Sequence, residues 1–150
     1  MSDEKLTIGI VCPYAWDVPG GVQFHVRDLR NALTKEGHTV SVLAPAENDD
    51  DLPHYVTSTG RPIAVPYNGS VARLNVGFRS TRRVREWIRN GNFDVMHVHE
   101  PLSPSIGAVA LWAAQGPIVA TWHSSMEKSR VLSAGFYLAQ TVMEKTRGRI

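Results

Sequence analysis

Two adjacent glycines stand where a proline-rich loop meets a segment with helical spacing. Residues 11–25 read VCPYAWDVPGGVQFH, so Gly20 and Gly21 directly precede the apolar periodicity that begins at Val22. A helix that starts here presents unpaired N–H groups and about half a positive charge, which suits a phosphate, and glycine lets a bulky anion approach. A tight turn that needs a positive φ is the alternative. The dinucleotide-binding fingerprint is excluded, because G-x-G-x-x-G is missing and Pro45, not an acid, follows the second apolar run.

A histidine closes the last apolar run of the chain. His123 ends residues 117–123 and is followed by Ser124. A histidine at a ligand-binding edge can serve in catalysis, whereas a lone histidine elsewhere is a structural residue. Hydrolysis is not indicated, because the chain has no G-x-S-x-G and no carboxylates that must face each other.

Three more histidines raise the question of a metal site. His97 and His99 lie two apart on one strand face, with Glu100 just beyond. A metal site needs further ligands, and the sequence identifies none, so no metal site is predicted. His25 stands one turn into the first helical segment and is interpreted as a structural residue.

Residues 79–91 concentrate positive charge. A solvated helix face explains this pattern. Alternatively, basic residues near anionic lipid each contribute about 1 kcal/mol, and a shallowly inserted Trp87 or Phe78 would add reversible surface binding. Arg89 belongs to the same charge run, and the predicted membrane-contact residues are Arg79, Arg82, Arg83, Arg85 and Trp87.

Alternating strands and helices must position these residues. The predicted strands are nearly continuous apolar runs, typical of a parallel sheet covered on both faces. They span residues 6–12, 39–44, 62–67, 93–99 and 117–123, and the predicted helices span 21–36, 80–90, 103–115 and about 131–147. Residues 44–63 carry an acidic run and are expected to form a solvated loop. The pattern predicts a doubly wound α/β fold with a mainly parallel sheet, whose ligands bind at the carboxyl ends of the strands.

The totals set limits on the class of protein. A chain of 150 residues is long enough for one core, and a net charge of +2 does not point to nucleic acid. The single cysteine, Cys12, is expected to be a buried free thiol. Acids near the N-terminus do not fit a signal peptide, and the longest apolar run, residues 106–114, is too short to span a bilayer. These features favour an intracellular, non-spanning chain.

Several stretches together resemble one enzyme family. The sequences GIVCPYAWDVPGGVQFHV, GHTVSVLAP, VPYNGSVARL, FDVMHVHEPLSPS and GPIVATWHSSMEKS are similar to the N-terminal, Rossmann-like half of GT-B, family-4 retaining glycosyltransferases. The similarity is greatest to the actinobacterial phosphatidylinositol mannosyltransferases, and PYNGSVARL is the more specific part of it. The resemblance implies transfer of mannose from GDP-mannose to the inositol ring of phosphatidylinositol, by an enzyme peripheral on the cytoplasmic face of the plasma membrane.

The resemblance also assigns roles to residues. It implies that the backbone at Gly20 and Gly21 approaches the donor diphosphate and that His123 is the catalytic residue at the sugar-transfer site. No tightly bound cofactor is implied, and a divalent metal is left open. The implied contacts to the inositol and phosphate of the acceptor are Tyr14, Gln23, Tyr67, Asn68, Arg73, Ser124 and Lys128.

The chain departs from the family in three respects. Leu102 stands where related enzymes commonly carry Asn, and Ser124 replaces a commoner threonine. The second, nucleotide-sugar-binding domain of GT-B enzymes is missing, so residues 1–150 are expected to be an acceptor-binding fragment that is inactive alone. A family-4 enzyme with another sugar or glycolipid acceptor, and a non-catalytic module that binds anionic membranes, are the alternatives.

Overall fold

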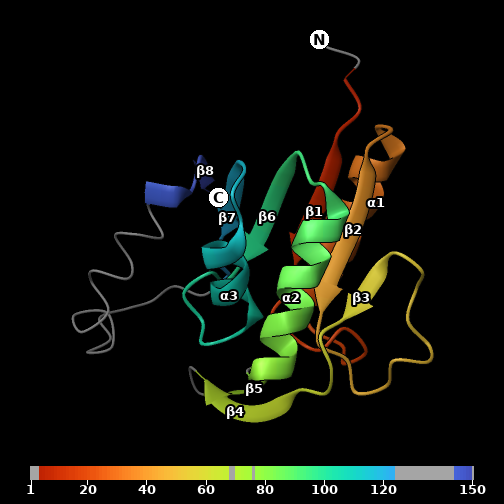
Figure 1. Cartoon of the computed structure of the whole chain (residues 1–150). Coiled ribbons are helices and arrows are strands. Elements are labelled where there is room, and N and C mark those ends of the chain that lie inside the picture. The colour runs from red at the N-terminus through yellow and green to blue at the C-terminus, as the bar shows by residue number, and fades with distance from the viewer. Residues whose placement is uncertain (1–3, 68–69, 76, 124–143, 150) are drawn as a thin grey trace.

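A parallel β-sheet runs through the centre of the molecule and carries helices on both faces (Figure 1). The structure is a computed structural model, and it describes residues 4–67, 70–75, 77–123 and 144–149. Within these ranges the main sheet has six strands in the order β3-β2-β1-β6-β7-β8, and every adjacent pair is parallel. The strands are β1 Thr7–Val11, β2 Thr39–Ala44, β3 Val56–Ser58, β6 Val95–His99, β7 Ile118–Thr121 and β8 Gly148–Arg149.

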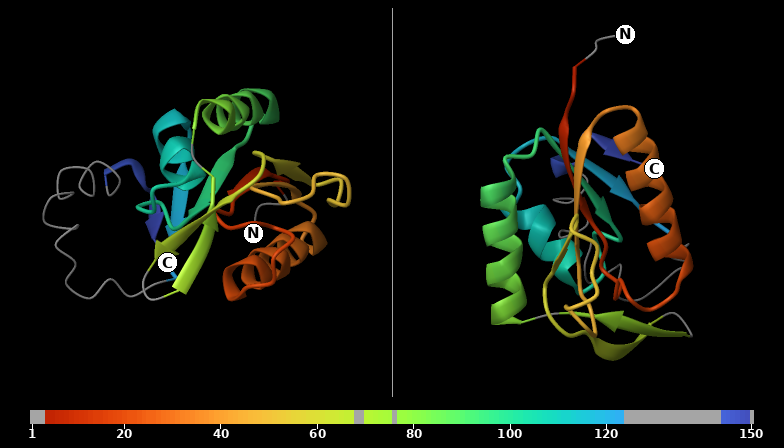
Figure 2. Two further views of the ribbon diagram at one scale, coloured as in Figure 1. Left: turned by 90° about the horizontal axis from the view of Figure 1, so that it is seen from below. Right: turned by 90° about the vertical axis from the view of Figure 1, so that its right-hand side faces the viewer.

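Each face of the sheet has its own apolar core. Ile8, Ile10 and Cys12 point to the face covered by helix α1 (Gly21–Lys35), while Val11 points to the opposite face. That opposite face is covered by α2 (Phe78–Gly91) and α3 (Ile106–Ala113), as the right-hand view of Figure 2 shows. The predicted doubly wound α/β fold is therefore confirmed. The free Cys12 thiol is also buried as predicted, and burial raises its pKa to about 12.

Helix α2 lies close against the sheet because β1 offers it a glycine. A Cβ atom on Gly9 would come within 2.8 Å of the Trp87 indole and 2.9 Å of the Phe93 ring. The Trp87 and Phe93 rings pack together with their centroids 4.4 Å apart, and Trp87 is only 9% exposed. The prediction that Trp87 contacts a membrane is therefore wrong. Trp87 lies three residues after the buried Val84, on the helix face that packs against the sheet.

One predicted strand belongs elsewhere. Residues 62–67 were expected to form the third parallel strand, but β4 (Ile63–Tyr67) pairs in antiparallel register with β5 (Ser70–Leu74) in a separate hairpin. The third strand of the main sheet is instead β3, inside the stretch that was expected to be a loop. Figures 1 and 2 show the hairpin lying across the carboxyl edge of the main sheet. The fold therefore places residues 63–74 beside the carboxyl edge of the main sheet, not within it.

The remaining boundaries agree closely with the predictions. Strand β2 has the predicted bounds, and α1 ends one residue before the predicted 21–36. Most of the predicted helix 131–147 lies outside the described residues, and the short strand β8 was not predicted. Among the helices that the structure describes, none is long and apolar enough to cross a membrane.

Candidate functional site

The carboxyl edge of the sheet gathers four loops around one point. The strand order reverses between β1 and β6, and ligands of open α/β sheets bind outside the carboxyl ends at such a switch point. The loop after β1 is tied to the hairpin by a hydrogen bond from Ala15 N–H to the Arg73 carbonyl, 3.2 Å long. The loops after β6 and β7 are joined by Glu100 N–H donating to the Thr121 carbonyl at 2.8 Å. Main-chain hydrogen bonds therefore link these loops in two pairs.

The glycine loop is held in place by a buried glutamine. Gln23, 6% exposed, donates from Nε2 to the carbonyls of Ala15 and Val18, each at 3.0 Å. Gly20 has an extended backbone with φ −169°, so it is not a left-handed turn residue. A Cβ atom there would lie 2.4 Å from Gln23 Oε1, which explains the glycine. Both amide hydrogens of Gln23 serve the loop, which leaves its Oε1 for the predicted contact with an acceptor.

The start of α1 remains open to a ligand. A Cβ atom on Gly21 would meet nothing within 4 Å. No side chain caps the helix at Gly20, and its first turn contains no acidic residue. Unpaired N–H groups at an uncapped helix start suit an anion. Of the two interpretations of the glycine pair, the turn with positive φ is excluded at Gly20.

Replacing Gln23 with alanine should lower the free energy of unfolding by about 2 kcal/mol, because two loop carbonyls lose their partner. Urea unfolding followed by circular dichroism measures this. The control is Gly21→Ala, which adds a methyl group into open space and should leave stability unchanged or slightly higher. Equal loss of stability in both variants would contradict this role of Gln23.

Four histidine rings contact one another at the same edge. The rings of His97 and His99, on β6, are parallel with centroids 4.4 Å apart, and His123 stacks on His99 at 5.0 Å. His99 Nδ1 and His123 Nε2 share a hydrogen bond of 2.7 Å. His25, from α1, meets His123 edge-on with a centroid distance of 5.2 Å. This histidine array joins α1, β6 and the loop after β7.

Burial keeps the inner histidines neutral. Desolvation lowers the pKa of His97 to about 4 and that of His99 to about 2, and the neighbouring histidines add to the effect. The pKa of His123 is also lowered, first by burial and then by His25, while Glu100 acts in the opposite direction. A neutral imidazole has one donor and one acceptor nitrogen. In the bond between His99 and His123 one ring therefore donates and the other accepts, so the tautomers of the two rings depend on each other.

A buried glutamate sets the position of His123. Glu100 is 2% exposed, and its Oε1 accepts a hydrogen bond of 2.6 Å from the His123 backbone N–H. Its φ of 49° lies in the left-handed region, which few residues other than glycine adopt. The sequence had placed Glu100 only next to His97 and His99, without assigning it a role. Its observed role is to hold the backbone on which His123 stands.

The predicted acceptor contacts are only partly placed. Tyr14 is half-buried on the loop after β1, beside the apolar core under α1. Arg73, in the hairpin, forms an ion pair with Glu47, so the acidic run is not simply solvated. Tyr67 ends β4, and its side chain lies outside the description. The predictions for Asn68, Ser124 and Lys128 also lie outside the described residues.

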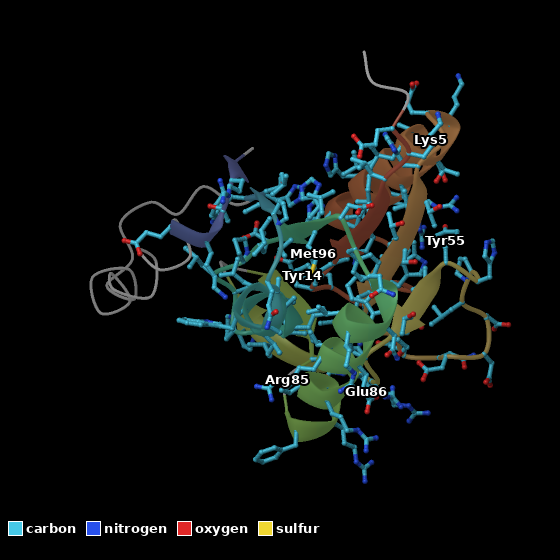
Figure 3. The ribbon with its side chains drawn as sticks, turned by 45° about the horizontal axis from the view of Figure 1, so that its top comes forward. Lys5, Tyr14, Tyr55, Arg85, Glu86 and Met96 are labelled. Atoms are coloured by element: carbon cyan, nitrogen blue, oxygen red, sulfur yellow. The ribbon has the colours of Figure 1, made fainter. Side chains whose placement is uncertain are left out.

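Helix α2 presents a basic face with one protruding aromatic ring. Phe78 is 98% exposed at its first residue. Arg82 pairs with Glu86 at 3.7 Å and Arg83 with Asp49 at 3.9 Å. Arg85 and Glu86 are seen along this helix in Figure 3. Three exposed arginines form no ion pair with any residue that the structure describes: Arg79, Arg85 and Arg89.

Comparison with known proteins identifies the family. The sequence profile of Glycosyltransferase Family 4 matches residues 19–148. The chain is 53% identical over 145 residues to the phosphatidyl-myo-inositol mannosyltransferase of Mycolicibacterium smegmatis. The matched residues are 97% of this chain and 38% of that protein. For the protein of the same name from Mycobacterium tuberculosis, identity is 50% over 145 residues, with 97% and 38% covered. For that of Propionibacterium freudenreichii, identity is 42% over 127 residues, with 80% and 33% covered.

The chain thus spans well under half the length of these relatives, and their similarity extends over most of the chain itself. The parallel sheet, the open start of α1 and the strand-end histidine agree with the resemblance that the sequence motifs indicated. The family profile covers residues 19–148, which is most of the chain. The chain belongs to glycosyltransferase family 4.

Proposed function

We propose that this chain is the acceptor-binding part of a retaining mannosyltransferase, which moves mannose from GDP-mannose to the inositol ring of phosphatidylinositol. The relatives named above all carry the name phosphatidyl-myo-inositol mannosyltransferase. Because the chain covers only 38% of the first of them, a second domain is proposed to bind most of the nucleotide. The chain alone should then have little or no transferase activity.

The proximity of His25 and His123 supports a site for this reaction at the carboxyl edge of the sheet. The ring of His25 on α1 and the ring of His123 lie 5.2 Å apart, so the open start of α1 and the strand-end histidine face one place. The N–H groups at Gly21 would hold the donor diphosphate there. His123, held by Glu100 and His99, would line the site of sugar transfer.

The hairpin would supply the acceptor phosphate with its charged partner. Arg73 lies beside the loop after β1, since its carbonyl accepts from Ala15 N–H. A guanidinium group has five donors, so Arg73 can bind a phosphate while it keeps Glu47. Tyr14 lies on the same loop and is half-buried. We propose that Arg73 and Tyr14 contact the inositol phosphate group. Further proposed contacts are Tyr67, Asn68, Ser124 and Lys128.

A membrane would present this acceptor to the basic face of α2. We propose that the enzyme is peripheral on the cytoplasmic face of the plasma membrane, with Phe78 entering the lipid interface. An exposed aromatic ring on a helix with exposed arginines is the arrangement that supports reversible binding to anionic lipid. Arg82 and Arg83 would contribute less than Arg85, because each already has an acidic partner.

Replacing Arg85 and Arg89 with serine should lower binding to phosphatidylinositol-containing vesicles about 30-fold at low salt, since each charge contributes about 1 kcal/mol. Vesicle co-sedimentation measures the partition coefficient. The matched control removes two exposed charges at the other edge of the sheet, Lys5 and Lys35. Phe78→Ser should also weaken binding, and its effect should persist in high salt. Equal losses in the arginine and lysine variants would contradict docking through α2.

Titration of the labelled chain with glycerophosphoinositol tests the proposed acceptor site. Amide resonances of Tyr14, Gly21 and His123 should shift, while Asn92 at the opposite edge should not. The control ligands are myo-inositol, which lacks the phosphate, and glycerol phosphate, which lacks the ring. Binding of both controls as tightly as glycerophosphoinositol would contradict recognition of an inositol phosphate.

A further inference from the structure

Three histidines converge at the carboxyl edge in an arrangement that suits a metal ion. His25 comes from α1, His99 from the end of β6 and His123 from the loop after β7. One ring nitrogen from each lies within 4.8 Å of the other two. The sequence had left His99 without further ligands, because His25 and His123 are far from it along the chain.

The buried member of this histidine triad has an unsatisfied nitrogen. His99 is fully buried, and its Nε2 has no hydrogen-bond partner among the described residues. Nδ1 of the same ring bonds to His123 Nε2 at 2.7 Å. Buried polar atoms in native proteins nearly always have a partner, so an orphaned imidazole nitrogen requires an explanation. A bound cation would provide one.

We propose that His25, His99 and His123 form a binding site for a divalent transition metal, with Zn²⁺ as the ion that fits best. Zn²⁺ accepts three imidazoles at about 2.0–2.1 Å and leaves a fourth position for water. Tetrahedral bonds of that length place the nitrogens about 3.3 Å apart. The ligand nitrogens, which lie within 4.8 Å of one another, must therefore rearrange around the ion. The exposed His25 can approach the ion, and His123 must give up its hydrogen bond to His99 to bind it, while the buried His99 provides the fixed point.

Neighbouring residues hold two members of the triad in place. Residues beside metal ligands commonly orient them. Here the His97 ring stacks on His99 at 4.4 Å and is itself fixed by a hydrogen bond of 2.7 Å to Thr121 Oγ1. Glu100 fixes the His123 backbone. No carboxylate belongs to this cluster within the described residues, and Mg²⁺ and Ca²⁺ prefer oxygen ligands, so the site favours Zn²⁺ over both.

Metal binding would have a consequence that rests on the proposed function. Zn²⁺ would engage a ring nitrogen of His123, the residue proposed at the sugar-transfer site. Zinc binding and mannose transfer should then compete. Zinc should inhibit the complete enzyme, and a chelator should restore it.

Calorimetric titration of the untagged, chelator-treated chain with Zn²⁺ tests the site without any assay of transfer. One equivalent should bind, and Mg²⁺ should give no heat. His25→Gln and His123→Gln should each lower zinc affinity at least tenfold, because loss of a ligand should cost no less than loss of a neighbour that orients it. His54→Gln, which changes an exposed histidine outside the triad, should bind zinc like the parent chain.

Circular dichroism and ring ¹⁵N resonances separate loss of a zinc ligand from loss of folding. Both replaced histidines are exposed, so the variants should fold, and circular dichroism checks this. Ring ¹⁵N resonances of His25, His99 and His123 should shift on zinc addition, while those of His54 should not. Unchanged affinity in His25→Gln and His123→Gln, or ring shifts confined to other histidines, would overturn the proposal. If zinc binds as expected but no mannose transfer exists to be inhibited, only the proposed function fails.

Discussion

Replacing His123 with alanine should lower mannose transfer at least 10²-fold in a chimera that carries this chain in place of the matching part of the Mycolicibacterium smegmatis relative. That relative is 53% identical to the chain, so the interface with its remaining part should be preserved. The expected size is the lower end of what a positioned acid–base group contributes. The structural reason is the fixed orientation of His123, which bonds to His99 through its side chain and to Glu100 through its backbone. Initial rates with radiolabelled GDP-mannose measure the effect.

Two further variants separate catalysis from folding. His54→Ala removes an exposed histidine elsewhere and should transfer at the parent rate. Circular dichroism and urea unfolding of His123→Ala should show a folded protein, since the side chain is exposed. Normal turnover in a folded His123→Ala chimera would return His123 to a structural role.

Acidification from pH 7 to pH 5 should destabilise the chain by about 4 kcal/mol through two buried histidines. The folded pKa values of His97 and His99, about 4 and about 2, lie below the value of about 6.5 expected in the unfolded chain. Below pH 6.5 these two histidines therefore bind protons in the unfolded state but not in the folded state, and the free energy of unfolding falls. At pH 5 each histidine should contribute about 2 kcal/mol of this loss, because one pKa unit corresponds to 1.36 kcal/mol.

Urea unfolding at pH 7, 6 and 5, in the presence of a chelator, measures this dependence. His97→Gln removes one of the two buried titrating groups, so its stability should fall about 2 kcal/mol less than that of the parent between pH 7 and pH 5. The same pH dependence in the parent chain and in His97→Gln would show that His97 is not held neutral by burial.

The main sheet was predictable because its strands are buried on both faces. Near-continuous apolar runs with helical segments between them specified β1, β2, β6 and β7 and the face that each helix covers. The hairpin was missed although local signals were present. Pro66 cannot donate to a central ladder, and Asn68-Gly69 between two β-rich runs is a strong hairpin signal. Strand β3 has only three residues, too few for any periodicity to reveal.

The site was predictable in position but not in its contacts. Strand-end histidines could be placed at the carboxyl edge, because parallel strands end together there. His25 was dismissed, although a residue in the first turns of α1 must lie near that same edge. The hydrogen bonds of Gln23 to the loop could not be predicted from sequence, since the carbonyls that it binds are brought to it only by the fold. The burial of Trp87 could have been predicted, because its spacing from Val84 places both residues on the core face of the helix.

The product that the chimera forms from GDP-mannose is the most direct test of the proposed function. With phosphatidylinositol as acceptor, we expect mannosyl-phosphatidylinositol with retained anomeric configuration, and no product from the 150-residue chain alone. Transfer only to a soluble sugar or to another glycolipid, with phosphatidylinositol left unchanged, would contradict the proposal. So would a folded chimera that transfers mannose to no acceptor while the relative itself remains active under the same conditions.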